Sequence, residues 1–296
     1  MNPTEPNRWP KAEAPSVAAP SKRRWPHRPL VAVVALAPLP GAPLYAGSHR
    51  AIEQQALADV QLFARAGVDA LLLENSHDLP YLKARLPPEA VRLITRIARR
   101  ARQCFAGLMG IQLLEAANET ALLVAAEADL DFVRVEGYVF AHVGGAGLIE
   151  GCAGRLLRLR REWHVEHVRL LADLKKKHCA HALTGDLDIV DELKQAEFFL
   201  VDGVIVTGSR TTEPPRLTDL YRVRRHAHVP VWIGSGLTAR NLHRYYDRAD
   251  GFIVGSTFRV GGDFFARPDP ARVQDFVQQW RVCAGIADHN RGRVRT

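Results

Sequence analysis

The chain has 296 residues, of which 47% are hydrophobic and 24% charged, a composition typical of a globular protein with one large domain or two small ones. No apolar run reaches the roughly 18 residues of a membrane span, so we expect a soluble protein. The formal net charge of +8 lies mainly at the ends, with +4 in residues 1 to 30 and +3 in residues 281 to 296. This distribution argues against a dedicated nucleic-acid site on the folded body.

The two ends of the chain differ in composition from the body. Residues 1–29 are rich in Pro, Ala and Arg and lack a continuous apolar segment, which predicts a disordered leader and not a secretory signal. Residues 283–296 are predicted to form a disordered basic tail. Four cysteines without a C-x-x-C pair indicate reduced thiols in a cytoplasmic protein. Organellar targeting by the Arg-containing leader is the alternative.

From Leu30 onward, apolar runs alternate with amphipathic stretches. Strands are predicted at residues 31–37, 68–74, 107–114, 132–139, 168–174, 203–207, 231–233 and 251–255. Helices are predicted at residues 52–66, 88–102, 119–128, 154–166, 188–199, 216–226 and 270–282, and a further helix is expected to begin at Thr238 and Asn241. Eight such units between residues 30 and 282 predict one α/β domain, a (β/α)8 or TIM barrel of about 250 residues. An open doubly wound sheet is the alternative, but it would need a single strand-end crevice in place of two neighbouring glycine turns.

Glycine turns follow the seventh and eighth predicted strands. They contain Gly234, Ser235 and Gly236 in the first turn, and Gly255 and Ser256 in the second. Glycine turns leave backbone N–H groups open to a ligand, and a helix N-terminus behind such a turn adds a positive dipole end. Phosphate commonly binds to these two loops in (β/α)8 barrels. We therefore expect these five residues to bind the phosphate of a small phosphorylated ligand.

Polar residues stand at the ends of the other predicted strands, where buried strands are otherwise apolar. Asp173, Lys177 and His178 after the fifth strand are candidate acid–base residues, because neighbouring charge and burial can bring their pKa values toward neutrality. The candidates for binding the substrate are Glu74, Asn75, Arg134, Glu136 and Thr207.

The alternation of a strand makes further predictions for these positions. Asp173, Lys175 and Lys177 are expected to share one side, while Lys175 and Lys176 are interpreted as a solvated loop end. A structural alternative for the inward-facing charges is an ion-pair layer of Arg134, Glu136 and Asp173 inside the barrel.

The sequence leaves the cofactor unknown. Carboxylates, an amide and a histidine at strand ends suit a hard divalent cation. No compact ligand motif is present, so a divalent cation is an open alternative for which we assign no ligand residues. No organic cofactor is implied. No G-x-S-x-G elbow occurs, and the cysteines have no base partner in sequence, which disfavours nucleophilic catalysis by serine or cysteine.

Several short segments, in one order, give the chain a resemblance to the BtpA family, also written BtpA/SgcQ, from about residue 31 to residue 267. The matching segments are residues 39–43, 67–70, 74–75 with 78, 87–89, 132–135, 147–151, 172–173 with 177–178, 206–208, 234–238 with 241, and 250–255. The resemblance implies a (β/α)8 barrel. Cyanobacterial members are linked to the biogenesis or stability of photosystem I as membrane-peripheral proteins, other members sit among carbohydrate-transport genes, and no reaction is attached to the family.

The chain departs from the family pattern at three places. Residues 112–117 replace an Asn-x-x-Arg-Asn-Asp run, residues 144–146 replace Thr-Asp-Gln, and Glu136 stands where Asn is usual. These changes remove an arginine and at least two acids from the expected site and introduce carboxylates at Glu115 and Glu136. If the family is enzymatic, they imply altered specificity or a lost reaction.

Three hypotheses follow. The first is a barrel that binds a sugar phosphate or a nucleotide fragment and acts on it by acid–base catalysis. The second is a non-catalytic assembly or stability factor with a protein partner or a weak peripheral membrane contact, to which the basic ends would contribute. The third is a paralogue with a vestigial site. A homo-oligomer is compatible with each of them.

Overall fold

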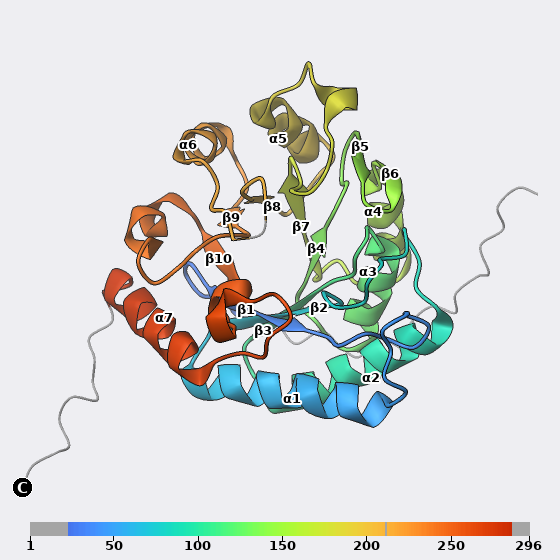
Figure 1. The fold of residues 1–296 in the computed structure, drawn as a ribbon. Coiled ribbons are helices and arrows are strands. Elements are labelled where there is room, and N and C mark those ends of the chain that lie inside the picture. Colours follow the sequence, from blue (N-terminus) through green and yellow to red (C-terminus); the bar gives the residue numbers. More distant parts are fainter. Residues whose placement is uncertain (1–22, 211, 286–296) are drawn as a thin grey trace, which may run out of the picture.

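The computed structural model describes residues 23–210 and 212–285, which form a closed barrel of eight parallel strands with helices around it (Figure 1). The barrel strands, in their order around it, are β1 (Leu30–Ala35), β2 (Ala70–Glu74), β3 (Leu108–Gln112), β4 (Phe132–Val135), β7 (Arg169–Leu174), β8 (Gly203–Val206), β9 (Val231–Ile233) and β10 (Gly251–Val254). Because β10 pairs with β1, the sheet has no edge, and the predicted (β/α)8 fold is confirmed.

Seven α-helices are present in the described residues: α1 (His49–Ala66), α2 (Pro88–Cys104), α3 (Asn118–Glu127), α4 (Ala153–Glu162), α5 (Ile189–Phe198), α6 (Leu217–His226) and α7 (Pro270–Cys283). They follow the sequence around the ring, so that α7 returns to contact α1 (Figure 1). Local signals set their ends. The hydroxyl of Ser48 caps α1, and Gly67, at φ 83°, ends it in the left-handed conformation that glycine adopts without steric cost.

Two segments depart from the predicted pattern. The helix expected at Thr238 and Asn241 is absent, and the chain forms two short 3₁₀ turns there, Leu242–Arg244 and Tyr246–Arg248. The side chains of Thr238 and Asn241 accept hydrogen bonds from each other's backbone N–H groups at 3.2 and 2.8 Å, so they close a local turn in place of a helix. The predicted strand at 132–139 is also shorter and ends at Val135; a hairpin of β5 (Ala141–Gly144) and β6 (Gly147–Glu150) follows it.

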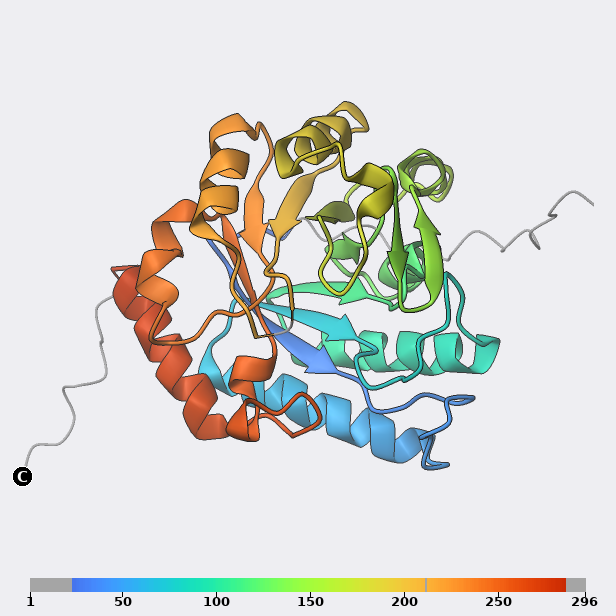
Figure 2. The same cartoon turned by 45° about the horizontal axis from the view of Figure 1, so that its top comes forward.

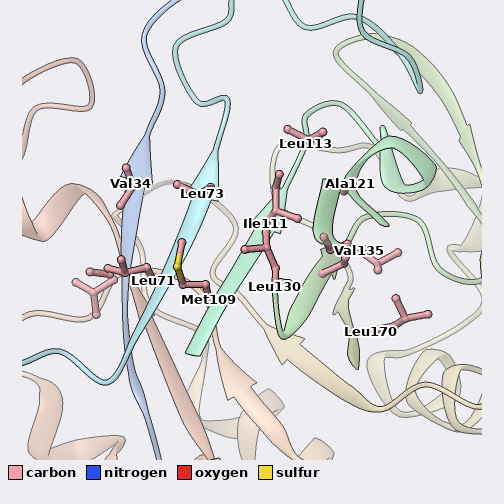
Figure 3. Close-up of a cluster of buried hydrophobic side chains, with 14 of the residues drawn as sticks. Val34, Leu71, Leu73, Met109, Ile111, Leu113, Ala121, Leu130, Val135 and Leu170 are labelled. Carbon is pink, nitrogen blue, oxygen red and sulfur yellow. The ribbon is translucent and has the colours of Figure 1, made fainter. Parts of the chain in front are cut away.

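Alternate strand residues point to the two sides of the barrel wall. One set packs against the helices, as Val34, Leu73, Ile111, Val135 and Leu170 do in Figure 3. The other set fills the barrel interior: Val31, Val33, Ala70, Leu72, Leu108, Phe132, Leu171, Ile205, Trp232 and Ile253. The next inward positions toward the carboxyl ends are polar residues or glycines on every barrel strand but β1, where Ala35 follows, and this change of residue type opens the interior into a site.

Residues 23–29, predicted to belong to the leader, contact the barrel. Trp25 lies 5.8 Å from the ring centroids of both Phe132 and Trp232, and the Arg169 guanidinium is 4.3 Å from the centroid of the Trp25 ring. Arg23 forms ion pairs with two aspartates of the loop before β4. The described part of the leader therefore covers the amino-terminal end of the barrel. The rest of the predicted leader, residues 1–22, and tail residues 286–296 lie outside the described residues.

Candidate functional site

A cavity of about 400 Å³ opens at the carboxyl ends of the barrel strands. Its wall includes Glu74 of β2, Gln112 of β3, Arg134 of β4, Asp173 of β7, Gly234 after β9 and Gly255 after β10. These are the inward-facing positions that come after the apolar interior layer, which is why residues from six separate strands meet there. The hairpin β5–β6 stands at the rim, on the side away from α7 (Figure 2).

One half of the cavity, which we call the glycine half, consists of the turns at residues 234–236 and 255–256. All five residues predicted to bind phosphate line the cavity. Within the described chain, no hydrogen bond uses the backbone N–H groups of Ser235, Gly236, Gly255 or Ser256 as donors. Four unused donors on one wall form a site suited to an anion.

Hydrogen bonds within the loop after β9, and between that loop and the one after β10, hold the glycine half in place. The Asn241 side chain donates to the Gly236 carbonyl at 3.0 Å, and the Thr257 hydroxyl donates to the Leu237 carbonyl at 2.6 Å. Gly236 has φ +69°, and a Cβ there would collide with the backbone of Glu213 and Pro214. Only glycine therefore fits at Gly236. The predicted helix dipole does not contribute, because a short 3₁₀ turn replaces that helix.

The opposite wall, which we call the charged half, begins with a buried ion pair. The Arg134 Nη2 atom lies 3.0 Å from Asp173 Oδ1, and Arg134 Nε is 3.2 Å from both carboxylate oxygens. Burial lowers the pKa of Arg134, but the carboxylates of Asp173, Glu74 and Glu136 together outweigh it and raise that pKa above its ordinary value. The ion-pair alternative is therefore correct for these two residues, which also line the cavity.

A second charged group in this half contains Lys176. Its Nζ lies 2.9 Å from Glu115 Oε1 and 3.3 Å from Glu136 Oε1, so the interpretation of Lys176 as a solvated loop residue was wrong. The physical reason is a backbone turn: Lys175 has φ 43°, which ends the strand alternation. Lys175 instead donates to the Thr184 carbonyl at 3.2 Å, outside the cavity wall, and the prediction that it shares a side with Asp173 was wrong as well.

Glu136 and Glu115 hold Lys176 from two sides and differ in their electrostatics. Burial raises the pKa of Glu136 to about 7, although Lys176 opposes that effect. Burial also raises the pKa of Glu115, but hydrogen bonds from Lys176 and from the Ala146 backbone N–H, at 2.7 Å, bring it below its usual range. A carboxyl that titrates near neutrality thus stands beside one that stays ionised.

The departures at Glu115 and at residues 144–146 contact each other in space. A Cβ at Gly144 would collide with the Glu115 carboxylate, and the Ala146 N–H donates to that same carboxylate. The hairpin β5–β6 has to be small at Gly144 for Glu115 to reach Lys176. The two departures from the family pattern, at Glu115 and at residues 144–146, are therefore in direct contact at the cavity wall.

Three further candidates stand around the mouth of the cavity. Lys177 lines it, and both burial and the nearby charge of Arg134 lower the pKa of its amine. His178 also lines it, and burial together with Lys177 and Lys176 lowers the pKa of its imidazole, which favours the neutral form at pH 7. Glu74 accepts a 2.6 Å hydrogen bond from the Ser76 hydroxyl through Oε1.

Two predicted substrate-binding residues do not line the cavity. Asn75 is fully buried, accepts from the Leu114 N–H at 2.7 Å and donates to the Leu114 carbonyl at 3.0 Å, so it fixes the loop after β3. Thr207 extends the inward pattern of β8, but its hydroxyl is buried behind the wall. Both positions follow a strand, and only the tertiary packing shows that other atoms cover them.

Other lining residues were not among the predicted site residues: Gln112, Glu115, Lys176, Tyr81, Arg259 and Phe264. Gln112 had a usable signal, because it is a polar inward position of a buried strand. Its Nε2 donates to Glu136 at 2.9 Å, while its buried Oε1 has no partner among the described residues. Tyr81, Arg259 and Phe264 come from loops and carried no periodic signal.

The donor set fits an anion better than a metal ion. Among the described residues, no group of three or more His, Cys, Asp or Glu side chains is arranged to hold a metal. The carboxylates of Asp173, Glu115 and Glu136 are each engaged by a cationic side chain. The cations of the wall and the free N–H groups of the glycine half instead favour a negatively charged ligand.

The sequence model of the BtpA family matches residues 26–281. The chain belongs to the BtpA family. Among BtpA-family relatives, a Caenorhabditis elegans protein named "Uncharacterized protein F13E9.13, mitochondrial" is 39% identical over 260 residues, which cover 85% of this chain and 92% of that protein. "Photosystem I biogenesis protein BtpA" from a Synechocystis strain is 34% identical over 255 residues, which cover 85% and 88%.

Solved structures similar to this BtpA-family chain share its fold at low sequence identity. Thiamine phosphate pyrophosphorylase from Pyrococcus furiosus has a TM-score of 0.54 and 13% identity, with 86% of this chain and 96% of that chain covered. N-(5'-phosphoribosyl)anthranilate isomerase from the same organism has a TM-score of 0.54 and 14% identity, with 86% and 100% covered. These similarities show the barrel fold. Within the described residues, no helix is long and apolar enough to cross a membrane.

Proposed function

We propose that this BtpA-family protein binds a small phosphorylated metabolite, a sugar phosphate or a nucleotide fragment, in the cavity at the carboxyl end of the barrel. The observation that carries the proposal is the set of four backbone N–H groups in the glycine half that donate to no other described residue. Oriented N–H groups of this kind bind phosphate without any cationic side chain beside them. The names of two structural neighbours contain phosphate compounds, which is consistent with the proposal.

The rest of the ligand would contact the charged half. The unpartnered Oε1 of Gln112 suits a hydroxyl donor, because a buried acceptor without a partner is costly to leave unpaired. Glu74 and Asp173 are carboxylates at the wall, and Lys177 and His178 have lowered pKa values there. This combination supports acid–base catalysis on the bound metabolite.

Calorimetric titration with inorganic phosphate and a panel of sugar phosphates and nucleotides tests the phosphate site. The informative variant is Gly255→Asp, because a Cβ at Gly255 meets only Val33, at 3.6 Å, and the new carboxylate would repel the ligand. A side chain at Gly236 would instead collide with neighbouring backbone, so a loss of binding in such a variant could result from misfolding.

We expect Gly255→Asp to weaken binding by about tenfold or more, equivalent to about 1.4 kcal/mol. The neutral, equal-sized Gly255→Asn variant and Ser256→Ala should bind within about threefold of the parent, because the N–H groups remain. Equal affinity of Gly255→Asp and the parent would exclude the glycine half as the phosphate site. Absence of binding by any compound of the panel would overturn the proposed function.

A second candidate function rests on the name of the Synechocystis relative, which assigns that protein to photosystem I biogenesis. In this alternative the barrel is a scaffold for a protein partner or a membrane surface, and the basic ends of the chain add attraction to acidic lipids. The described cavity would then be dispensable, so Gly255→Asp would retain the assembly activity. The word "mitochondrial" in the name of the worm relative supports organellar targeting as the alternative to a cytoplasmic location.

A further inference from the structure

Three consecutive lysines after β7 have different surroundings. Lys175 pairs with Glu192 at 3.9 Å and donates to Thr184, and Lys176 is held between Glu115 and Glu136. Lys177, in contrast, has no hydrogen bond or ion pair within the described residues, although it is partly buried and lines the cavity. A partly buried lysine ordinarily gains a carboxylate partner, so an unpaired amine at a cavity wall is a candidate for chemistry.

We propose that the Nζ atom of Lys177 forms a Schiff base with the carbonyl carbon of a phosphorylated aldehyde or ketone, such as an open-chain sugar phosphate. The inference rests on the proposed function, because the glycine half supplies the phosphate contact, and it adds the covalent role and the carbonyl to the substrate class. Nucleophilic lysines are activated by desolvation and by a neighbouring cation. Lys177 has both, since its partial burial at the wall and the nearby charge of Arg134 lower the pKa of its amine and outweigh the carboxylates of Glu74, Asp173 and Glu136.

The lowered pKa of Lys177 makes the neutral amine accessible at lower pH than for an exposed lysine. The buried ion pair with Asp173 fixes the position of Arg134, whose charge acts on Lys177. Lys176 is unsuited to the same role, since its two carboxylates raise the pKa of its amine above the ordinary value. The structure thus separates a charged lysine at position 176 from an activated one at position 177.

The step balances without an oxidant, a reductant or a further reactant. The neutral Nζ of Lys177 attacks the carbonyl carbon, a C–N bond forms, and the carbonyl π electrons move to oxygen, which takes up a proton. The nitrogen loses a proton, the hydroxyl of the carbinolamine is protonated and leaves as water, and a C=N bond forms. Glu74, a carboxylate at the same wall, is placed to carry these protons. Addition of water reverses the sequence and releases the carbonyl compound.

Reductive trapping tests this role in the full-length protein. Glyceraldehyde 3-phosphate, ribose 5-phosphate and pyridoxal 5'-phosphate serve as carbonyl probes of increasing size, each with cyanoborohydride, and intact mass with peptide mapping locates the adduct. Glycerol 3-phosphate carries phosphate but no carbonyl and serves as a competitor. Lys177→Met removes the amine, and Lys175→Met is the matched control because Lys175 lies outside the cavity wall.

We expect at least one probe to label Lys177 about tenfold or more faster than Lys175, because Lys177 lines the cavity that binds the probe and Lys175 lies outside its wall. Lys177→Met should lose this adduct, Lys175→Met should keep it, and glycerol 3-phosphate should suppress it. Thermal unfolding of both variants checks that they are folded.

The remaining outcomes separate the two proposals. Calorimetric binding of glycerol 3-phosphate without any adduct at Lys177 would overturn the Schiff base and leave the phosphate site standing. An adduct at Lys177 that Gly255→Asp leaves undiminished would remove the phosphate role of the glycine half and leave the amine role standing. Labelling spread evenly over exposed lysines would also overturn the proposal.

Discussion

The glycine half and the charged half of the cavity are built from different chemical groups. In the glycine half, the residues of two turns line the cavity, and four of their backbone N–H groups donate to no other described residue. In the charged half, Arg134 pairs with Asp173, and Lys176 pairs with Glu115 and Glu136. The glycine half therefore has hydrogen-bond donors free for a ligand, whereas most charged groups of the charged half are already paired with each other.

This difference indicates that the charged half mainly stabilises the fold, whereas the glycine half mainly binds the ligand. Buried ion pairs become costly when one partner is lost, because the remaining charge has no solvent. Free N–H groups at an open cavity can hydrogen-bond to water, so the absence of a ligand costs the folded state little free energy. We therefore expect substitutions in the charged half to change the free energy of unfolding, and substitutions in the glycine half to change ligand affinity.

The largest effect is expected from Asp173→Asn, which leaves the buried Arg134 guanidinium without its counter-ion. The free energy of unfolding should fall by about 3–5 kcal/mol. Glu127→Gln, which breaks a more exposed ion pair with Arg99, should cost less than about 1 kcal/mol. Urea unfolding of both variants and of Gly255→Asn measures these values. A loss as small for Asp173→Asn as for Gly255→Asn would remove the distinction between the two halves.

A pH-dependent effect should follow from Glu136. Its pKa is about 7 in the folded chain against an ordinary value of 4.5, so the folded state keeps a proton that the unfolded state has lost. The contribution of Glu136 to stability is therefore largest below pH 4.5 and declines as pH rises to 7. Glu136→Gln removes this decline. The stability of the variant relative to the parent should rise across the window by up to about 3 kcal/mol.

Urea unfolding at pH 4.5 and pH 7.5 measures that difference, and the comparison with the parent cancels the titration of groups common to both proteins. A difference that does not vary with pH would show that Glu136 is ionised throughout and that Lys176 outweighs burial. The charged half would then be a fully ionised network, without a carboxyl that titrates near neutrality.

The smallest effect is expected from Gly144→Ala, which would push against the Glu115 carboxylate and disturb its contact with Lys176. We expect a loss of about 1–3 kcal/mol in the free energy of unfolding. Gly145→Ala is the matched control, because its Cβ lies at an ordinary 3.7 Å from the same carboxylate. In a double-mutant cycle, Glu115→Ala should relieve the loss. Equal losses for the two glycine variants would show that Glu115 moves aside freely.

Strand alternation predicts from the sequence which strand residues lie at the cavity, although their roles there stay predictions. Glu74, Arg134 and Asp173 are inward positions at strand ends, and they line the cavity as the alternation predicts. The method failed for Asn75, which a loop covers, and for Lys176, which a backbone turn at Lys175 directs inward. Strand alternation holds only as long as the backbone stays extended.

The amino-acid sequence by itself determined the barrel and the positions of its glycine turns, because hydrophobic periodicity and turn residues are local properties of the chain. Only the tertiary structure decided which charges pair, because pairing depends on distances between residues from different strands. The hairpin at Gly144 admits Glu115 to Lys176, and Glu115 and Glu136 both pair with that lysine. Lys177 has no hydrogen bond or ion pair among the described residues, and no local pattern distinguishes it from its two lysine neighbours.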